Sequence, residues 1–345
     1  MPRGDRPRPD LSESKLIEIV AGVRPCRASG LRIETALERA GTVEKPVVHH
    51  YGHGGSGYTT GLGSAECAAQ LTCDALQTHG NDRVAVIGGG IIGLYTARTL
   101  TQRGITVTVY AEKHLKGTAS AVAGGLWLPT GVNFGDSPER VAWFLSILRR
   151  SLNLLRALDP ERYAYETLPV YEPDWAVEPE RYFDNGTIEP PRSIDRFPIE
   201  GLHIRGATYD CPFIHAPIHA AAIAEDARSA GARFETQRFI SKGDVLNLDE
   251  PVIVNCSALG SRELFDDTEM FGARGTLAKF EPQDLGYIWH DSYRYIFPRR
   301  DALIVGGSFE PNVETTEPNH ALIRERLEEQ RARFGQAGDI ATAGA

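Results

Sequence analysis

The chain has 345 residues, of which 41% are hydrophobic and 24% charged, as expected of a globular protein long enough for two domains. Its formal net charge of −9 argues against nucleic acid and anionic membrane surfaces as general partners. No window approaches the roughly twenty apolar residues of a membrane span. The first ten residues, rich in Arg and Pro, lack the apolar core of a signal peptide.

The first 82 residues alternate apolar and glycine-rich segments. Residues 15–27, "KLIEIVAGVRPCR", predict a strand that enters a turn, and "LRIETALERAG" is expected to be a connector. "KPVVHHYGH" predicts a short strand. Glycines then interrupt the chain as far as Ser64, a candidate N-cap for a helix over residues 64–76 with Glu66 in its first turn.

The residues that follow predict a βαβ unit. "RVAVIGGG" is a strand with a tight turn, "IIGLYTARTLTQRG" a helix ended by Gly104, and "ITVTVYAE" a second strand. Further helices are expected in "RVAWFLSILRRSLNLLRAL", "HAPIHAAAIAEDARSAGARF" and "NHALIRERLEEQRARFG", a buried strand in "PVIVNCSALGSREL", and a hairpin in "RYIFPRRDALIVGGSFE". This alternation predicts an α/β fold.

The turn after the first strand of this unit carries the pattern GxGxxG. Gly88 allows the tight turn, Gly90 lets a pyrophosphate approach the backbone, and Gly93 lets the helix pack closely on the strand. The helix start favours the phosphates. Glu112, at the end of the second strand, is placed to bind ribose hydroxyls and disfavours NADP. The pattern predicts a dinucleotide site and leaves FAD and NAD open.

Several segments together resemble the D-amino-acid oxidase family, FAD enzymes that include D-aspartate oxidase. They are "RVAVIGGGIIGL" with "VTVYAEK", then "AGGLWLP", "VIVNCSALGS", "YIFPRRDALIVGG", and "GVRPCR" followed by "VVHHYGHGGSGYTTGLGSAECAAQL". In the family the last two come at the C-terminal end, whereas here they precede the fingerprint. The resemblance therefore implies a circular permutation, with the family's ends joined near residues 71–82 and new ends between Gly335 and Leu16.

The resemblance implies an α/β D-amino-acid-oxidase fold in permuted order. A Rossmann-like FAD-binding domain is expected over residues 28–130 and 200–262. A mixed-sheet substrate domain is expected over residues 11–27, 131–199 and 263–335. Residues 1–10 and 336–345 are expected to be flexible tails.

The family's substrate site implies roles for a few residues. Arg24 is expected to bind the substrate carboxylate, because a guanidinium fork suits a bidentate pairing. Tyr295 is expected to hold the same carboxylate, and the carbonyl of Gly55 to face the substrate amine. Asp291, with Tyr293 nearby, falls where the family carries a second active-site tyrosine.

The resemblance also implies which residues hold FAD. The helix expected near Ser64 would place its positive dipole end near the flavin. The histidines 49, 50 and 53 suggest structural hydrogen bonds rather than a metal site, since a glycine-rich loop is a poor metal scaffold. The expected cofactor-binding residues are Gly54, Gly57, Tyr58 and Thr59 at the flavin ring, Gly88, Gly90, Ile91, Ile92, Gly93 and Ser257 at the pyrophosphate, Gly124, Gly125 and Leu126 along the flavin, and Glu112, Lys113 and Ile240 towards the adenosine.

The implied activity is FAD-dependent oxidation of the Cα–N bond of a D-amino acid to the imino acid, with dioxygen reduced to hydrogen peroxide. Leu128 stands where relatives carry a glutamine, and with Asp291 it leaves open an N-substituted glycine or other specialised amine acid as substrate. An NAD-linked dehydrogenase and a flavin-binding protein without catalysis also stay open. The expected partners are the amino-acid substrate and dioxygen, with no nucleic acid and no membrane, and a homodimer is left open. Five scattered cysteines favour reduced thiols and a cytoplasmic location.

Overall fold

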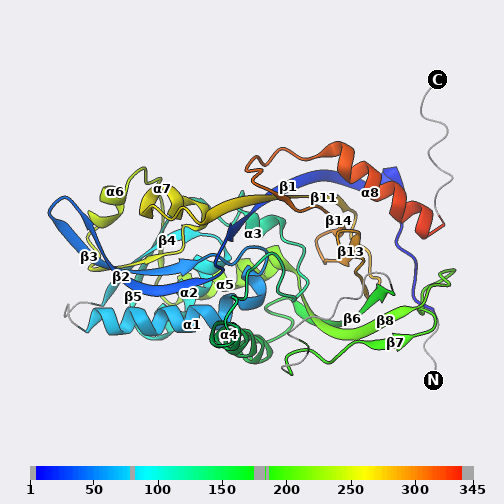
Figure 1. The fold of residues 1–345 in the computed structure, drawn as a ribbon, viewed down its shortest axis with the longest axis horizontal. Helices are drawn as coiled ribbons and strands as arrows, with labels where there is room; N and C mark the ends of the chain where they lie inside the picture. The colour runs from blue at the N-terminus through cyan, green and yellow to red at the C-terminus, as the bar shows by residue number, and fades with distance from the viewer. Residues whose placement is uncertain (1–4, 78–81, 175–182, 184–185, 336–345) are drawn as a thin grey trace.

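The computed structural model describes residues 5–77, 82–174, 183 and 186–335. These residues build two β-sheets with helices packed against them. In Figure 1 the six-stranded sheet lies on the left, between α1 and α2 on one face and α6 and α7 on the other. The nine-stranded sheet lies on the right, with α8 along its outer face. The described part of the chain begins and ends on the right, beside the nine-stranded sheet.

The six-stranded sheet contains the predicted βαβ unit. Its strands run in the order β2 (Arg32–Ala40), β3 (Val43–Tyr51), β10 (Val252–Asn255), β4 (Arg83–Gly89), β5 (Thr106–His114) and β9 (Arg233–Thr236). All neighbours from β3 to β9 are parallel, and α2 (Ile91–Gln102) connects β4 to β5. This is the parallel, helix-covered sheet typical of nucleotide-binding domains.

Strand β2 corrects the expectation of a connector over "LRIETALERAG". It pairs antiparallel with β3 along its whole length, from Arg32 opposite Tyr51 to Ala40 opposite Val43. As an edge strand it buries little on either face, and Leu37 is 66% exposed. The sequence therefore lacks the apolar alternation that marks a half-buried strand, and backbone pairing with β3 holds the segment.

The two faces of this sheet bury alternate residues of β4. Val84 and Val86 pack towards α1 (Gly57–Leu76), α2 and α5 (Ala216–Ser229). Ala85 and Ile87 pack on the other face towards α6 (Lys242–Leu246) and α7 (Ser261–Phe265). A strand buried on both faces reads as a continuous apolar run, which is why "RVAVIGGG" predicted it.

The nine-stranded sheet is mixed and joins segments from both ends of the chain. Its pairs are antiparallel except for the parallel β6 and β12. The predicted hairpin forms from β13 and β14. The order is β1 (Leu16–Arg27), β11 (Met270–Phe280), β14 (Leu303–Gly306), β13 (Tyr295–Pro298), β12 (Ile288–Trp289), β6 (Tyr165–Pro173), β8 (Gly206–Ile214) and β7 (Arg192–Ile194), with β15 (Glu310–Pro311) paired to β11.

One face of this sheet turns towards the helices and the other is covered by α8 (His320–Arg333). Tyr295 and Phe297 share a core with residues of α1, α2, α4 (Pro138–Arg156) and α5, whereas Ile296 packs with residues of α8. Strand β8 lies in this sheet, although the expected domain boundary at residue 200 assigned it to the FAD-binding domain. None of the described helices combines the length and apolarity that crossing a bilayer requires.

Residues 5–11, of which residues 5–10 were expected to belong to a flexible tail, make specific contacts with the rest of the protein. Arg8 Nη1 donates to the carbonyl of Phe334 at 3.0 Å, and Asp5 pairs with Arg196 at 2.7 Å. Leu11 is fully buried. Residues 5–11 therefore lie along the nine-stranded sheet and the end of α8. The rest of the expected tails, residues 1–4 and 336–345, lies outside the described residues.

The contact between α1 and α4 gives a test of the fold. A Cβ on Gly63 would lie 2.4 Å from the carbonyl oxygen of Ile147 and 2.7 Å from Ser151 Oγ. We expect Gly63→Ala to lower the free energy of unfolding by about 1–3 kcal/mol, because the backbone of α4 has to move. Urea denaturation followed by circular dichroism measures this change.

The matched control is Gly243→Ala in α6, where the nearest atom to an added Cβ lies 3.6 Å away. We expect this variant to be as stable as the parent or slightly more stable, since alanine favours a helix over glycine. Equal stability of the two variants would contradict the close packing at Gly63.

Candidate active site

The turn between β4 and α2 is built by close backbone approaches at its glycines. Gly88 has a φ of +127°, and a Cβ there would lie 2.3 Å from the carbonyl oxygen of Cys256. A Cβ on Gly93 would lie 1.9 Å from the carbonyl oxygen of Gly88, so α2 packs directly on the turn. Gly90 is the N-cap of α2, whose start points into a large cavity that Gly88, Gly90, Ile91 and Ile92 line. This is the arrangement expected for binding a pyrophosphate.

The far end of this cavity lies at the end of β5. Glu112 and Lys113 of β5 line it together with Ile240, and Ser257, expected at the pyrophosphate, also lines the cavity. Arg238 lies 3.9 Å from Glu112, a solvated pair. Ile240 is 78% exposed, so its side chain is available to cover a ligand at the cavity mouth. The structure thus brings together the residues expected on the adenosine side.

Helix α1 begins at Gly57 rather than near Ser64, which corrects the expected helix start. The glycines that suggested a loop are helical residues at close contacts, since a Cβ on Gly61 would lie 2.6 Å from the ring of Tyr95. The amide of Thr59, expected to face the flavin, donates to the carbonyl of Ser56 at 3.0 Å. The positive end of α1 therefore lies at Gly57 and Tyr58, both of which line the cavity.

The loop before α1 is fastened to residues 130–131. Gly54 has a φ of +54°, and a Cβ there would lie 1.7 Å from the carbonyl oxygen of Gly131. The amide of Gly55 donates to the carbonyl of Thr130 at 3.0 Å. Ser56 Oγ donates to the same carbonyl at 2.9 Å and accepts from the amide of Thr130 at 2.7 Å. These contacts hold the loop rigidly at the cavity wall.

The three histidines make structural hydrogen bonds. His50 bonds Thr96 Oγ1 at 2.9 Å and Ser64 Oγ at 2.8 Å, and His53 Nε2 bonds the same Ser64 hydroxyl at 2.9 Å. Burial lowers the pKa of His53 to about 3, and burial followed by the charge of His53 lowers the pKa of His50. His53 Nδ1 is buried without a hydrogen-bond partner among the described residues, and His53 lines the cavity. An unpartnered polar atom in this position fits a bound polar cofactor.

Arg24 reaches the cavity from β1. Its Nη1 donates to the carbonyl of Ser308 at 2.9 Å, and its guanidinium carbon lies 5.6 Å from the ring centre of Phe309. A Cβ on Gly275 would lie 2.4 Å from Nη1, so only glycine leaves room for the guanidinium. Arg27, three residues along β1, pairs with the buried Asp267 at 2.9 Å.

Tyr295 lies on the cavity face of β13. Its ring stacks on Phe297 with centroids 4.2 Å apart and passes over Gly306, where a Cβ would lie 2.3 Å from the ring. Burial raises the pKa of Tyr295, and the nearby charge of Arg24 lowers it by less. The phenol is therefore protonated at neutral pH and can donate a hydrogen bond.

The segment of Gly124, Gly125 and Leu126 also lines the cavity. A Cβ on Gly124 would lie 2.8 Å from the ring of Phe297, and one on Gly125 would lie 2.0 Å from the carbonyl oxygen of Ile214. The segment therefore passes between the cavity and the nine-stranded sheet, as expected for an element along the flavin.

The structure places Asp291 away from the cavity, which corrects its expected catalytic role. Asp291 is 2% exposed and forms an ion pair with Arg333 of α8, on the opposite face of the sheet from Tyr295. Asp291 begins the turn between β12 and β13, where the amide of Arg294 donates to its carbonyl at 2.8 Å, and the turn directs its side chain to α8 while Ser292 and Tyr293 line the cavity. Tyr293 faces Phe309 with ring centroids 6.4 Å apart. Leu128 is buried and does not line the cavity.

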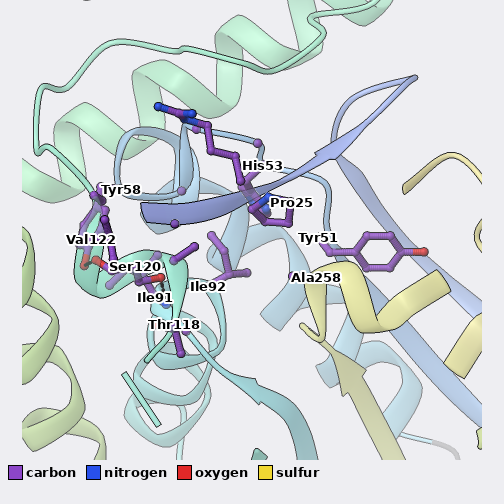
Figure 2. A pocket seen from close by; sticks show the side chains of 18 of the residues that line it. Pro25, Tyr51, His53, Tyr58, Ile91, Ile92, Thr118, Ser120, Val122 and Ala258 are labelled. Carbon is purple, nitrogen blue, oxygen red and sulfur yellow. Dashed lines mark hydrogen bonds between the residues drawn. The ribbon is translucent and has the colours of Figure 1, made fainter. Parts of the chain in front are cut away.

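All these elements surround one cavity of about 1140 Å³. Figure 2 shows Ile91 and Ile92 at the start of α2, with Ser120 on one side, Ala258 on the other, and His53 and Pro25 above. The cavity extends from Glu112 and Ile240 to Tyr295 and Phe309. A cavity this large, with two helix starts and glycine-lined walls, fits a dinucleotide together with a small substrate.

The sequence-based expectations missed several cavity residues, among them Ser120, Glu172 and His290. Ser120 Oγ accepts from the amide of Ile91 at 3.0 Å, and its carbonyl lies 2.9 Å from the hydroxyl of Tyr58. Glu172 of β6 and His290 after β12 line the cavity on the nine-stranded sheet. Ser120 lies in a run of small residues without a motif. Glu172, in the segment "PVYEPDW", resembles any solvated strand carboxylate until the sheet is assembled.

The chain is similar to known FAD-dependent oxidoreductases. The model of the family described as FAD dependent oxidoreductase matches residues 83–345. A D-amino-acid oxidase of Streptomyces coelicolor is 28% identical over 253 residues, which cover 71% of this chain and 75% of the relative. A human D-aspartate oxidase is 24% identical over 265 residues, which cover 71% of this chain and 74% of the relative.

Solved structures share the fold. A glycine oxidase from Bacillus cereus is 21% identical with a TM-score of 0.53, covering 72% of this chain and 77% of that one. An iminodiacetate oxidase from Chelativorans sp. BNC1 is 16% identical with a TM-score of 0.52, covering 74% and 80%. These likenesses concern the fold alone and confirm the expected α/β architecture.

The position of Asp291 gives a prediction for this site. Because its carboxylate is buried and paired, we expect Asp291→Asn to lower the free energy of unfolding by on the order of 3 kcal/mol. Glu329→Gln, which changes a more exposed ion pair with Arg294, is the control and should cost about 1 kcal/mol or less. Thermal and urea unfolding measure both. If Asp291→Asn were as stable as the parent and bound substrate more weakly, Asp291 would have a role in substrate binding and the structural role would be wrong.

Proposed function

Because this chain belongs to the family of FAD-dependent oxidoreductases that its residues 83–345 match, we propose that it is an oxidase of D-amino acids. FAD is its cofactor, and amino acids are the class of substrate on which its relatives act. The observation that carries the proposal is the meeting of Arg24, from β1, and Tyr295, from β13, in the cavity that holds the dinucleotide turn. The family's cofactor leaves no reason to retain an NAD-linked dehydrogenase.

The residues of the chain fix an amino acid by both ends of its backbone. The guanidinium of Arg24 pairs with the substrate carboxylate, and the protonated hydroxyl of Tyr295 donates a second hydrogen bond to it. The carbonyl of Gly55, held by the fastening to Thr130, accepts a hydrogen bond from the substrate amine. Bound in this cavity, FAD would supply the acceptor for the hydride of the substrate Cα. Positioning of the Cα–H bond by these groups supplies most of the rate enhancement, so no strong protein base is needed.

The alternative of an N-substituted glycine loses its original support. It was motivated by Asp291 and Leu128, and the structure places neither in the lining of the cavity. Near Asp291 the cavity is lined instead by Tyr293, and near Leu128 it is lined by residues 129–131. We therefore retain a primary D-amino acid as substrate and hydrogen peroxide as the product of dioxygen.

We also propose a reducing compartment, the cytoplasm, as the site of action. Cys26, Cys211 and Cys256 are buried and unpaired. Burial raises the pKa of Cys26 to about 11 and that of Cys256 to about 12, so these thiols are protonated and inert.

The function is tested by peroxide formation on the yellow holoprotein with a panel of D-amino acids. We expect Arg24→Ala to raise the KM of its substrates on the order of 100-fold while flavin absorbance is kept, because the carboxylate loses a bidentate partner. Arg39→Ala, at an exposed strand position, is the control and should leave the KM unchanged. Steady-state oxygen consumption measures the KM.

Two outcomes would contradict this account. No peroxide from any D-amino acid, with normal flavin content, would remove the proposed activity. An unchanged KM in Arg24→Ala would remove the role of Arg24 and leave the activity standing.

We further propose that the chain order is a circular permutation of the family's order. Residues 1–82 precede the matched region, yet β1 pairs with β11 and β3 with β10, both inside it. The two ends of the described chain are in contact, since Arg331 Nε donates to the carbonyl of Leu11 at 2.8 Å. The family's two ends are expected to be joined near residues 71–82, and residues 78–81 of this segment lie outside the described residues.

A rearranged chain tests the permutation. Residues 82–335, followed by a short Gly/Ser linker and residues 5–77, should fold and oxidise the same substrates within about threefold of the parent kcat/KM, because the packing contacts are kept. The same rearrangement opened inside β11, between Ala273 and Arg274, is the control and should not retain flavin. Loss of flavin from both chains would contradict the proposal.

A further inference from the structure

A buried carboxylate forms part of the cavity wall, and the chemistry proposed above does not use it. Glu172 lies near the end of β6 and is 5% exposed. It lines the cavity together with His290. Glu112 and Glu263 also line it, but from β5 and α7 beside the six-stranded sheet. Among the described residues, Glu172 is therefore the cavity carboxylate of the nine-stranded sheet, which carries Tyr295.

The hydrogen bonds of Glu172 leave one of its oxygens for a ligand. Oε1 accepts from the hydroxyl of Tyr209 at 2.7 Å and from Nδ1 of His290 at 2.5 Å. Both donors end on the same oxygen, and within the described residues no hydrogen bond reaches Oε2. Two donors fix the carboxylate, and its second oxygen is an acceptor with no protein donor. Because Glu172 lines the cavity and is otherwise 5% exposed, an acceptor of this kind favours a ligand that brings a donor or a positive charge.

The sheet register places Glu172 in line with Tyr295. Trp289 of β12 pairs with Tyr171 of β6 and with Ile296 of β13. One residue further along, His290 therefore lies between Glu172 and Tyr295 on the same face of three adjacent strands. At about 4.8 Å per strand, the backbones of Glu172 and Tyr295 lie roughly 10 Å apart. That separation is on the order of the length of an extended amino acid.

Along this row of strands the cavity therefore has groups that attract an anion at one end and a carboxylate that attracts a cation at the other. Arg24 and Tyr295 bind the carboxylate at one end, in the proposed function, and Glu172 stands at the other. Apolar side chains of Phe297, Leu277 and Phe183 line the cavity on the same side. A negative group beyond an apolar stretch complements a side chain with methylene groups and a terminal cation.

We propose that Glu172 determines substrate specificity and selects D-amino acids with a cationic side chain, such as D-lysine, D-ornithine or D-arginine. The ammonium or guanidinium donates to Oε2, while Tyr209 and His290 hold the carboxylate from Oε1. This inference rests on the proposed D-amino-acid oxidase activity and assigns its side-chain subsite.

The test compares substrates that differ mainly in the terminal charge. The holoenzyme is assayed for peroxide with D-lysine, its neutral counterpart D-norleucine, and the anionic D-glutamate. We expect the kcat/KM for D-lysine to exceed that for D-norleucine about tenfold or more, as a buried charge-assisted hydrogen bond allows.

Glu172→Gln removes the charge and keeps an acceptor for Tyr209 and His290. We expect it to lower the kcat/KM for D-lysine about tenfold or more, to change that for D-norleucine less than about threefold, and to raise that for D-glutamate. Tyr209→Phe is the matched control. It removes one hydrogen bond to Oε1 but keeps the charge, so the preference for D-lysine over D-norleucine should persist.

The outcomes separate the two proposals. Turnover of D-amino acids with equal kcat/KM for D-lysine and D-norleucine would overturn the specificity role and leave the oxidase activity intact. An equal loss on all substrates in Glu172→Gln would show that Glu172 supports the fold or the substrate amine instead, and would also overturn it. No turnover of any D-amino acid would overturn the proposed function and this inference with it.

Discussion

The starts of α1 and α2 lie side by side, and the cavity depends on this contact. A Cβ on Gly57 would lie 3.2 Å from Ile91 Cγ2, and one on Gly61 would lie 2.6 Å from the ring of Tyr95. Glycines at these places let the two helices approach until both N-terminal ends line one cavity. Each helix start favours negative charge, so one end suits a pyrophosphate and the other a flavin ring that becomes negative on reduction.

Glycines also make room for the side chains at the end of the cavity where the substrate is proposed to bind. Gly275 makes room for the guanidinium of Arg24, and Gly306 makes room for the ring of Tyr295. Arg24 and Tyr295 come from two strands of the nine-stranded sheet that are far apart in the sequence, β1 and β13. Because the sheet fixes their spacing, the two groups proposed to bind the carboxylate lie at a defined place in the cavity. The proposed specificity role of Glu172 depends on the same sheet, through the register of β6, β12 and β13.

Buried parallel strands and tight turns could be predicted from the sequence, because local patterns of residue types indicate them. The βαβ unit, the hairpin of β13 and β14, and the dinucleotide turn at Gly88 follow from local residue types. Arg24 and Tyr295 were identified through the family resemblance, because nothing local distinguishes them from other arginines and tyrosines. That all of them meet in one cavity depends on long-range pairing between β1 and β11, and between β3 and β10.

The errors have physical causes that act at long range. Glycines in α1 suggested a loop because glycine disfavours a helix in isolation, but here close packing against α2 and α4 requires them. Strand β2 has no apolar alternation because it lies at an edge. Asp291 was placed by its position in the sequence, but it lies in the turn between β12 and β13, where neighbouring side chains do not keep a fixed face. The path of this turn directs Asp291 to an ion pair with Arg333 and leaves Ser292 and Tyr293 at the cavity.

A crystal structure of the yellow holoprotein at a resolution that shows the flavin tests the central claim most directly. We expect the pyrophosphate at the turn of Gly88 to Ile91 and the flavin ring at Gly54 to Tyr58, with one ring face towards Arg24 and Tyr295. Electron density for a flavin ring away from the loop at Gly54, or on the side of the cavity remote from Arg24 and Tyr295, would contradict it.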